Sequence, residues 1–280
     1  MFLSQINIYP IKSCRGIPLK SAQVTPKGFP WDREFMWVDA QGKFITQRQY
    51  PLLATIEVKI DGETLTLSTD NSAINPFTFS PTLGEREIAV EVWRDRTIAI
   101  DQGNEVSSWL QSALSLPQNT GICLVRQSPQ HIRAINPQYA KTDSAPVSFA
   151  DGYPYLLTNT ASLAELNQKI TQHHQDPTQA IPMDRFRANL VVDTDEAFAE
   201  DNWETIQIGD VIFDVAKPCT RCIITTTNQF TGVRNSLKEP LRTLATFRQV
   251  ANQGIMFGEN LIPRNTGILN QGDEVVSSSY

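Results

Sequence analysis

The chain has 280 residues, of which 40% are hydrophobic, and a formal net charge of −6. This length is enough for two modest domains or one large one, and the apolar content is enough to form a core without disulfide support. The sequence has no basic tract and no apolar run near the roughly 20 residues of a membrane helix, which argues against a nucleic-acid polymer or a membrane as partner. Any positively charged site must therefore be local.

The cysteine pattern and the N-terminal residues indicate the cellular compartment of the protein. The four cysteines lack the spacing of a disulfide framework, and no basic stretch followed by an apolar stretch opens the chain. We therefore expect a reducing, cytoplasmic environment. The sequence also lacks the glycine-rich dinucleotide and nucleotide motifs, the nucleophile elbow of hydrolases and the His-Glu-x-x-His zinc motif.

The first hundred residues are rich in strand signals. Apolar alternation bounded by Gly, Pro, Asp or Asn predicts strands at residues 2–9, 35–38, 44–46 and 88–93. The clearest signal is residues 55–60, which are followed by Asp61-Gly62 and then by Leu65 and Leu67, a pattern typical of a β-hairpin. The N-terminal part is therefore expected to be a β-rich domain.

Two helices are predicted next. The first carries its apolar residues at one-face spacing and ends near Pro117; they are Val106, Trp109, Leu110, Ala113 and Leu114. The second is predicted to begin at Ser162, which forms a capping-box pattern with Glu165, and to turn Leu163, Leu166 and Ile170 inward. His173 and His174 fall in its last turn, where histidines favour solvent and the negative helix end over metal binding.

The remainder of the chain again favours strands. Residues 189–192, 205–208, 211–215, 223–227 and 272–276 are predicted strands, and a helix with Pro240 in its first turn would place Leu241, Leu244 and Phe247 inward. The proline-containing stretch 128–150 is the best candidate for a connection between domains or for an active-site loop.

The segment from Lys217 to Thr227 is the strongest chemical signal. It places Arg221 between Cys219 and Cys222, and a positive charge beside a thiol favours the thiolate that attacks disulfides or binds soft metals. Three interpretations are open: a dithiol redox pair, a structural zinc site, or a single sulfur ligand to a metal that brings its other ligands. The predicted strand after Cys222 argues against the redox pair, and the lack of a second ligand pair argues against zinc.

Three basic motifs accompany this segment, at residues 9–16, 31–35 and 184–189. Each places cations beside hydroxyl or amide groups at a predicted strand boundary, a combination suited to a phosphate pocket. The alternative is that these are surface cations that balance neighbouring acids.

Several segments together resemble the MOSC family, and in particular its amidoxime-reducing group. The matching segments run in the family's order over nearly the whole chain: residues 9–16, 32–33, 46–51, 149–166, 186–189, 199–203, 208–210, 219–222, 231–232 and 257–258. The resemblance implies an α+β, β-rich protein with an N-terminal β domain at residues 1–120 and a MOSC β-barrel domain with flanking helices at residues 121–280. The site would lie in the cleft between them.

The resemblance also implies a cofactor and its ligands. Cys222 would bind molybdenum as the protein's single sulfur donor, together with the two dithiolene sulfurs of the molybdenum cofactor (Mo-molybdopterin). The residues implied to line the cofactor pocket are Lys12, Ser13, Arg33, Thr158, Arg187, Asn189, Thr220 and Arg221. Cys219, Cys14 and Cys123 are expected to be small buried residues without a redox role.

The implied reaction is the two-electron reduction of small N-hydroxylated compounds such as amidoximes, hydroxylamines and N-hydroxylated base analogues. The chain starts at its first strand without a membrane anchor and carries no run of cluster-binding cysteines, so we expect a soluble protein that takes electrons from a separate reductase or small electron carrier. Asp201 and Asp184, which lie near matching segments, are candidates for a proton donor. Two other roles stay open: a sulfur relay, since MOSC domains also occur attached to cofactor sulfurases, and a non-catalytic cofactor carrier.

Overall fold

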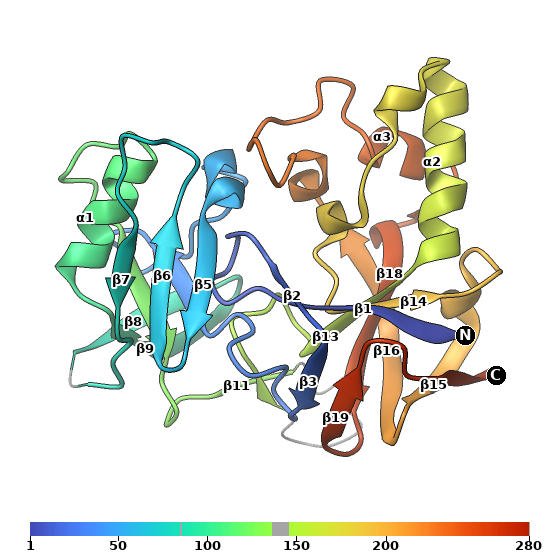
Figure 1. Cartoon of the computed structure of the whole chain (residues 1–280), viewed down its shortest axis with the longest axis horizontal. Coiled ribbons are helices and arrows are strands. Elements are labelled where there is room, and N and C mark those ends of the chain that lie inside the picture. The colour runs from blue at the N-terminus through green and yellow to red at the C-terminus, as the bar shows by residue number, and fades with distance from the viewer. Residues whose placement is uncertain (85, 136–145, 280) are drawn as a thin grey trace.

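The structure is a computed structural model that describes residues 1–84, 86–135 and 146–279. It has two lobes joined side by side (Figure 1). One lobe holds strands β5 to β9 and helix α1, and the other holds β1, strands β13 to β16, β18 to β20, and helices α2 and α3. The α+β, β-rich fold class expected from the sequence is confirmed.

The first lobe consists of two small antiparallel sheets and a helix. One sheet has the order β5-β6-β7 and the other the order β4-β10-β9-β8. The bounds are β4 (Phe35–Val38), β5 (Glu57–Asp61), β6 (Thr64–Ser68), β7 (Phe77–Phe79), β8 (Glu87–Val92), β9 (Asp95–Asp101), β10 (Cys123–Gln127), α1 (Asn104–Ala113) and the 3₁₀ turn η1 (Pro51–Thr55). The apolar face of α1 packs on these strands through Val106 and Leu110, which are fully buried. The hairpin predicted around Asp61-Gly62 is present as β5 and β6.

The second lobe is formed around a nine-stranded sheet. Its main path is β2-β1-β14-β13-β18-β16-β15-β20, with β17 added to β18, and β3 pairs separately with β19. Its strands are β1 (Phe2–Ile8), β2 (Ile17–Leu19), β3 (Ser21–Val24), β13 (Tyr155–Asn159), β14 (Leu190–Asp193), β15 (Trp203–Ile208), β16 (Val211–Arg221), β17 (Gln249–Val250), β18 (Gly254–Pro263), β19 (Gly267–Asn270) and β20 (Val275–Ser279). A core of buried side chains such as Leu3, Phe213 and Leu261 lies inside the curved sheet.

Helices α2 (Thr160–His174) and α3 (Leu241–Leu244) cover one side of this sheet. Short 3₁₀ turns connect the elements: η2 (Pro177–Gln179), η3 (Met183–Phe186), η4 (Ala199–Asn202) and η5 (Ile223–Thr226). Leu166 and Leu244 bury their side chains with Phe186 and Phe257, whose rings stack 3.9 Å apart. Phe186 thereby fixes the start of the segment that enters β14.

The two lobes are interleaved in sequence. Strand β1 pairs antiparallel with β14 in the second lobe, and β10 pairs with β4 and β9 in the first. Strands from before residue 120 therefore pair with strands from after it in both lobes. The division into residues 1–120 and 121–280 stays a proposal.

Three local predictions are wrong. Residues 223–227 form the 3₁₀ turn η5 instead of a strand, because their hydroxyls and amides bond back to carbonyls three residues earlier, as Thr225 and Thr226 do. Residues 44–46 form only an isolated bridge from Phe44 to Val38. Phe247 lies on the surface, with 36% of its area exposed, because α3 ends at Leu244.

The start of α2 also differs from the prediction. The helix begins at Thr160, and Asn159 caps it by accepting a hydrogen bond from the backbone N–H of Ala161. Ser162 is fully buried within the first turn, and its hydroxyl donates to the carboxylate of Glu200. The Ser162 hydroxyl is thus hydrogen-bonded to the buried Glu200 carboxylate and does not form the predicted capping box.

The stretch 128–150 falls partly outside the described residues, at 136–145. Its described ends form the short pair β11 (Arg133–Ala134) and β12 (Pro146–Val147). The chain then continues through residues 148–151 toward the site described below.

Candidate functional site

A cleft lies where the end of β1, the segment after β4, the approach to β14 and the end of β16 meet. Its lining is rich in cations, although the chain as a whole is acidic. The lining residues used below are Lys12, Ser13, Arg33, Thr46, Arg48, Ala150, Asp151, Arg185, Arg187, Asn189, Cys219, Thr220, Arg221 and Cys222. We describe it as two walls.

The Tyr9 wall consists of Tyr9, Asp32, Arg33, Arg187 and Asn189. The guanidinium groups of Arg33 and Arg187 each lie 4.3 Å from the centroid of the Tyr9 ring. Arg33 donates to Asp32 Oδ1 at 2.7 Å, to Asn189 Oδ1 at 2.9 Å and to the carbonyl of Arg187 at 2.9 Å. Arg187 donates to the amide oxygen of Gln229 at 3.0 Å. One carboxylate thus faces two guanidinium groups, which leaves a positive excess.

Burial dominates the electrostatics of the Tyr9 wall. It raises the pKa of the Tyr9 hydroxyl to about 12 and lowers the pKa of Arg187 to about 10, so at neutral pH the phenol is neutral and the guanidinium charged. Burial also raises the pKa of Asp32, while Arg33, the Tyr9 backbone N–H and Asn189 oppose that effect. Buried cations of this kind favour a bound anion.

The cysteine wall consists of Arg48, Cys219, Arg221 and Cys222. Arg221 donates to Cys219 Sγ at 2.9 Å and also to the carbonyl oxygen of Phe186, and Arg48 donates to Cys222 Sγ at 3.5 Å. In the described part of the chain none of these contacts involves a carboxylate. The Nε atoms of Arg221 and of nearby Arg185 are buried and have no hydrogen-bond partner within residues 1–84, 86–135 and 146–279. Unsatisfied buried donors are costly, so their presence at this cleft is consistent with a polar ligand.

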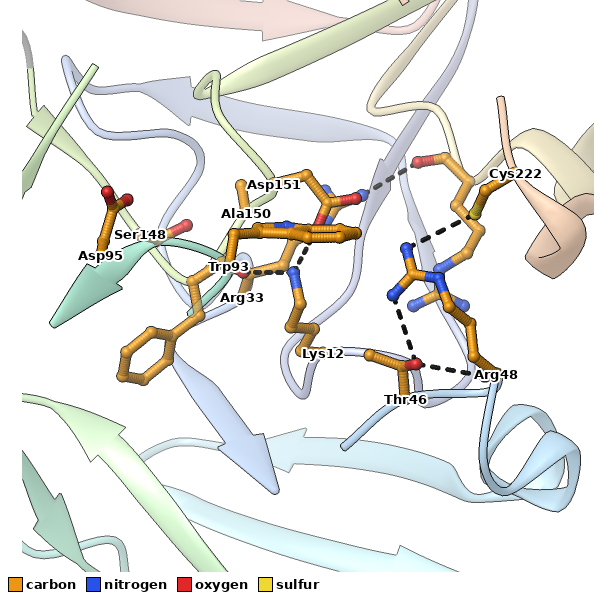
Figure 2. Close-up of polar contacts among 12 residues, drawn as sticks. Lys12, Arg33, Thr46, Arg48, Trp93, Asp95, Ser148, Ala150, Asp151 and Cys222 are labelled. Carbon is orange, nitrogen blue, oxygen red and sulfur yellow. Dashed lines mark hydrogen bonds and ion pairs between the residues drawn. The ribbon is translucent and has the colours of Figure 1, made fainter. Parts of the chain in front are cut away.

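A third group of residues closes the cleft near the first lobe. Lys12 is buried, and its ammonium donates to the carbonyl of Phe149 at 2.8 Å and to Asp151 Oδ1 at 2.5 Å. Trp93 Nε1 donates to the same carboxylate oxygen at 3.0 Å. Burial alone would raise the pKa of Asp151, but the charge and hydrogen bond of Lys12, the Trp93 N–H and the charge of Arg48 together lower it. Figure 2 shows this group beside Arg48, which reaches toward Cys222.

The backbone at this cleft is unusual. Ser13, Arg33 and Arg187 have φ angles of 72°, 51° and 55°, in the left-handed region that non-glycine residues seldom adopt. Such residues cluster at ligand-binding and active sites, where the surrounding structure holds them in place. Here the hydrogen bond from Arg33 to the carbonyl of Arg187 joins two of them.

The structure brings together eight of the nine residues that the sequence singled out. Lys12, Ser13, Arg33, Arg187, Asn189, Thr220, Arg221 and Cys222 all line the cleft. Thr158 does not. It is fully buried in β13, and its hydroxyl has no hydrogen-bond partner among the described residues.

Sequence reasoning gave no role to Arg48, Arg185 or Asp151, which also line the cleft. Arg48 and Asp151 lie in segments that resemble the family, residues 46–51 and 149–166, and Arg185 lies in the third basic motif. A charged residue within such a segment was the sequence signal that could have identified each of them. The two earlier candidates for a proton donor, Asp184 and Asp201, are not in the cleft lining. Burial raises the pKa of Asp184, and Asp201 is bonded to Arg248.

The remaining thiols and histidines are not among the residues that line this cleft, although Cys14 directly follows Ser13 of the lining. Cys14 is fully buried, and burial raises its pKa to about 12; burial also raises the pKa of Cys123 to about 11. A high pKa keeps a thiol protonated and unreactive, which agrees with the expected inert role. His174 does not face solvent as predicted, because its Nε2 lies 2.9 Å from the buried carboxylate of Glu239.

The described residues contain no group of three or more His, Cys, Asp or Glu side chains arranged to hold a metal ion. Within the same residues, no helix combines the length and the apolar character that a membrane crossing requires.

Comparisons with known proteins agree with the sequence resemblance. The model of the MOSC N-terminal beta barrel domain matches residues 1–117, and that of the MOSC domain matches residues 144–276. Human mitochondrial amidoxime-reducing component 1 is 32% identical over 98% of this chain and 82% of that protein. Molybdenum cofactor sulfurase 2 of Culex quinquefasciatus is 33% identical over 87% of this chain, which spans 32% of that longer protein. The chain therefore belongs to the MOSC family.

Proposed function

We propose that the cleft binds the molybdenum cofactor and that Cys222 supplies the protein's sulfur ligand to molybdenum. The observation that carries this proposal is that the Cys222 sulfur lines a cleft whose arginines exceed its carboxylates and retain buried, unpartnered N–H groups. A phosphorylated pterin is an anion with many hydrogen-bonding groups, and these residues fit its chemistry. The related proteins named above for the cofactor or for amidoxime reduction support the same choice.

The residues of the cleft divide into direct and supporting roles in this proposal. Arg187, Arg221 and Lys12 have charged groups that can bind the phosphate, and the Ser13 hydroxyl can orient it. Asn189 acts by holding Arg33, since its amide oxygen accepts from that guanidinium and its amide nitrogen donates to the carbonyl of Asn7. Thr220 has its hydroxyl bonded to the carbonyl of Gln253, so it would contribute through its backbone.

We further propose that the protein is a reductase of N-hydroxylated compounds. For an amidoxime the balanced reaction is RC(NH₂)=NOH + 2e⁻ + 2H⁺ → RC(NH₂)=NH + H₂O. When bound, the cofactor would supply the two-electron and oxygen-transfer chemistry, and the protein would orient the substrate and exclude competing reactions. The electrons would come from a separate reductase or a small electron carrier, and we place the protein in the cytoplasm.

A buried ammonium and an exposed carboxylate at the cleft suggest how the protein would handle the protons. Lys12 and Asp151 form a hydrogen-bonded pair at the edge of the cleft, and the pair has both a proton donor and an acceptor. We propose that this pair holds the proton that the released water needs.

One observation favours a second candidate, a sulfur relay. The Cys219 thiol is partly exposed and accepts a hydrogen bond from Arg221, and a persulfide on a cysteine near a cation would be stabilised in the same way. The sulfurase relatives point in the same direction. After incubation with a polysulfide, which transfers zero-valent sulfur to a thiol, mass spectrometry of the intact protein would detect an added 32-Da sulfur atom, and mass spectrometry of its peptides would assign it to Cys219 or Cys222.

The proposed function is tested by metal content and turnover. The wild-type protein is produced in a host that makes the molybdenum cofactor, alongside Cys222→Ser and the control Cys123→Ser, whose thiol lies outside the cleft. We expect near-stoichiometric molybdenum and benzamidoxime reduction with an artificial electron donor in the wild type and the control, and loss of both in Cys222→Ser. Wild-type turnover by Cys222→Ser would overturn the ligand assignment, and zinc or no metal in the wild type would overturn the cofactor.

A further inference from the structure

Trp93 occupies a position that rarely holds a large side chain. It is the first of the two residues in the turn between β8 and β9, where Val92 pairs with Asp95. Its φ angle is 58°, a conformation that two-residue hairpin turns usually assign to glycine, asparagine or aspartate. Its side chain is 43% exposed. Strained backbone positions cluster at functional sites.

The orientation of the Trp93 ring is fixed from three directions. Its Nε1–H donates to Asp151, the guanidinium of Arg48 lies 4.5 Å from the ring centroid, and the Phe44 ring lies 5.2 Å away at an angle of 53°. A cation over an indole face and a hydrogen bond to a carboxylate each stabilise one ring position. Trp93 is therefore a preorganised aromatic surface, in contrast to a mobile exposed side chain.

This surface adjoins the proposed reaction centre. Arg48 lies against Trp93 on one side and donates to Cys222 Sγ on the other, and Asp151 lines the same cleft (Figure 2). The Trp93 ring, which belongs to the first lobe, thus lies beside the cleft and remains partly exposed. A substrate that approaches Cys222 from this side meets the indole.

We propose that Trp93 is a specificity-determining residue that contacts the substrate and favours flat aromatic N-hydroxylated compounds over small aliphatic ones. This inference rests on the proposed reductase function. A rigid indole offers stacking to a planar ring at little entropic cost, whereas an aliphatic substrate gains almost nothing from it. Aromatic pairs of this kind change binding by about twofold to tenfold.

The test compares benzamidoxime with acetamidoxime, which share the reacting group and differ in the aromatic ring. Trp93→Leu removes the aromatic plane, while Trp93→Phe keeps a plane and loses only the N–H that bonds to Asp151. Phe230→Leu serves as the matched control, since Phe230 is 59% exposed and likewise lies under an arginine, Arg15, 5.1 Å from its ring centroid. Arg15 is not in the cleft lining, whereas the Trp93 partners Arg48 and Asp151 are. Molybdenum content is measured for each preparation, and kcat and KM are measured with the loaded enzyme. Calorimetry gives the dissociation constant of benzamidine, the aromatic amidine product.

We expect Trp93→Leu to lose about twofold to tenfold in the preference for benzamidoxime over acetamidoxime, mainly through KM, and to bind benzamidine more weakly by the same factor. Trp93→Phe should keep most of the preference, and Phe230→Leu should keep all of it. An equal loss for both substrates in Trp93→Leu and Trp93→Phe would overturn the inference, because it would show that Trp93 acts only by holding Asp151. Absence of turnover in the molybdenum-loaded wild type would instead refute the proposed function itself, and benzamidine binding would still decide whether Trp93 contacts the ligand.

Discussion

The two walls of the cleft carry similar charges but neutralise them differently. On the Tyr9 wall, Arg33 is bonded to a buried carboxylate, an amide and a backbone carbonyl. On the cysteine wall, Arg48 and Arg221 donate hydrogen bonds to sulfur, hydroxyl and carbonyl groups, and to no carboxylate in the part of the chain that the structure describes. The difference indicates that much of the first wall is occupied with holding the protein together, whereas the second wall keeps its charge available for a ligand. Loss of the paired carboxylate on the Tyr9 wall should therefore mainly lower stability. Loss of an arginine that contacts no carboxylate among the described residues, on either wall, should mainly weaken ligand binding.

The largest expected effect is the loss of stability in Asp32→Asn. The Asp32 side chain is fully buried, and its replacement removes the negative charge opposite Arg33. A buried ion pair gives little net stability over an apolar pair, but removal of one partner leaves the other charge uncompensated, at a cost of about 3–5 kcal/mol. Urea unfolding of the cofactor-free protein measures this. The control is Asp201→Asn, whose ion pair with Arg248 is partly solvent-exposed and should contribute less than about 1 kcal/mol. Equal losses in the two variants would contradict the structural role of the Tyr9 wall.

An effect of comparable size, but dependent on pH, is expected at Glu259, a buried carboxyl in β18 that has no cation in direct contact among the described residues. It is 2% exposed, and its Oε1 has no partner among the described residues. Burial, with the charges of Asp201 and Glu200, raises its pKa to about 9, although Arg248 opposes this. Protonation thus neutralises this group, as Arg33 neutralises Asp32.

The sign of the pH dependence follows from that raised pKa. The folded state holds the Glu259 proton more tightly than the unfolded state, so this contribution to stability is fully present below about pH 4.5 and is lost as the pH rises toward 9. The slope is at most about 1.4 kcal/mol per pH unit. Glu259→Gln cannot ionise, so its stability advantage over the wild type should grow between pH 5 and 8. If the difference in the free energy of unfolding between the two proteins stays constant over that pH range, the pKa of Glu259 is not raised in the folded state.

The sequence indicated part of the cleft lining, although not Arg48, and it indicated the local structure around the cleft less well. The basic motifs and the Cys219 to Cys222 segment line one cleft as expected, because charged and sulfur-containing residues mark their chemistry directly. The turn after Cys222 was mistaken for a strand, since β-branched residues favour strands and only the tertiary structure shows that Thr225 and Thr226 bond back to carbonyls in the turn.

The left-handed backbone of Arg33 and Arg187 was likewise not predictable, because neither residue type signals a positive φ. Trp93 was expected to end a strand and instead occupies the turn. Its contacts with Arg48 and Asp151 join segments far apart in sequence, and no local pattern reports such contacts.

Arg187→Ala should separate ligand binding from stability on the Tyr9 wall. Arg187 is stacked on Tyr9 like Arg33 but has no carboxylate in direct contact among the described residues. We expect the variant to retain about tenfold less cofactor, the effect of losing one charge-assisted phosphate contact of about 1.4 kcal/mol. Molybdenum content after gel filtration measures retention. The control is Arg248→Ala. The Arg248 guanidinium lies 4.4 Å from the centroid of the Phe198 ring, and Arg248 is not in the cleft lining. Unchanged occupancy in Arg187→Ala would remove Arg187 from the phosphate pocket.

The smallest effect is expected for Arg221→Gln on the cysteine wall. Glutamine can still donate a hydrogen bond but has no charge, and the charge of Arg48 remains on the same wall. We expect cofactor release to accelerate by about threefold and the free energy of unfolding to change by less than about 1 kcal/mol, since the lost contacts are hydrogen bonds to a thiol and a carbonyl. Dilution of loaded protein into a chelating acceptor gives the release rate, and urea unfolding gives the stability. A stability loss as large as that of Asp32→Asn would mean that the cysteine wall is as structural as the Tyr9 wall, and the excess charge there could no longer be assigned to a ligand.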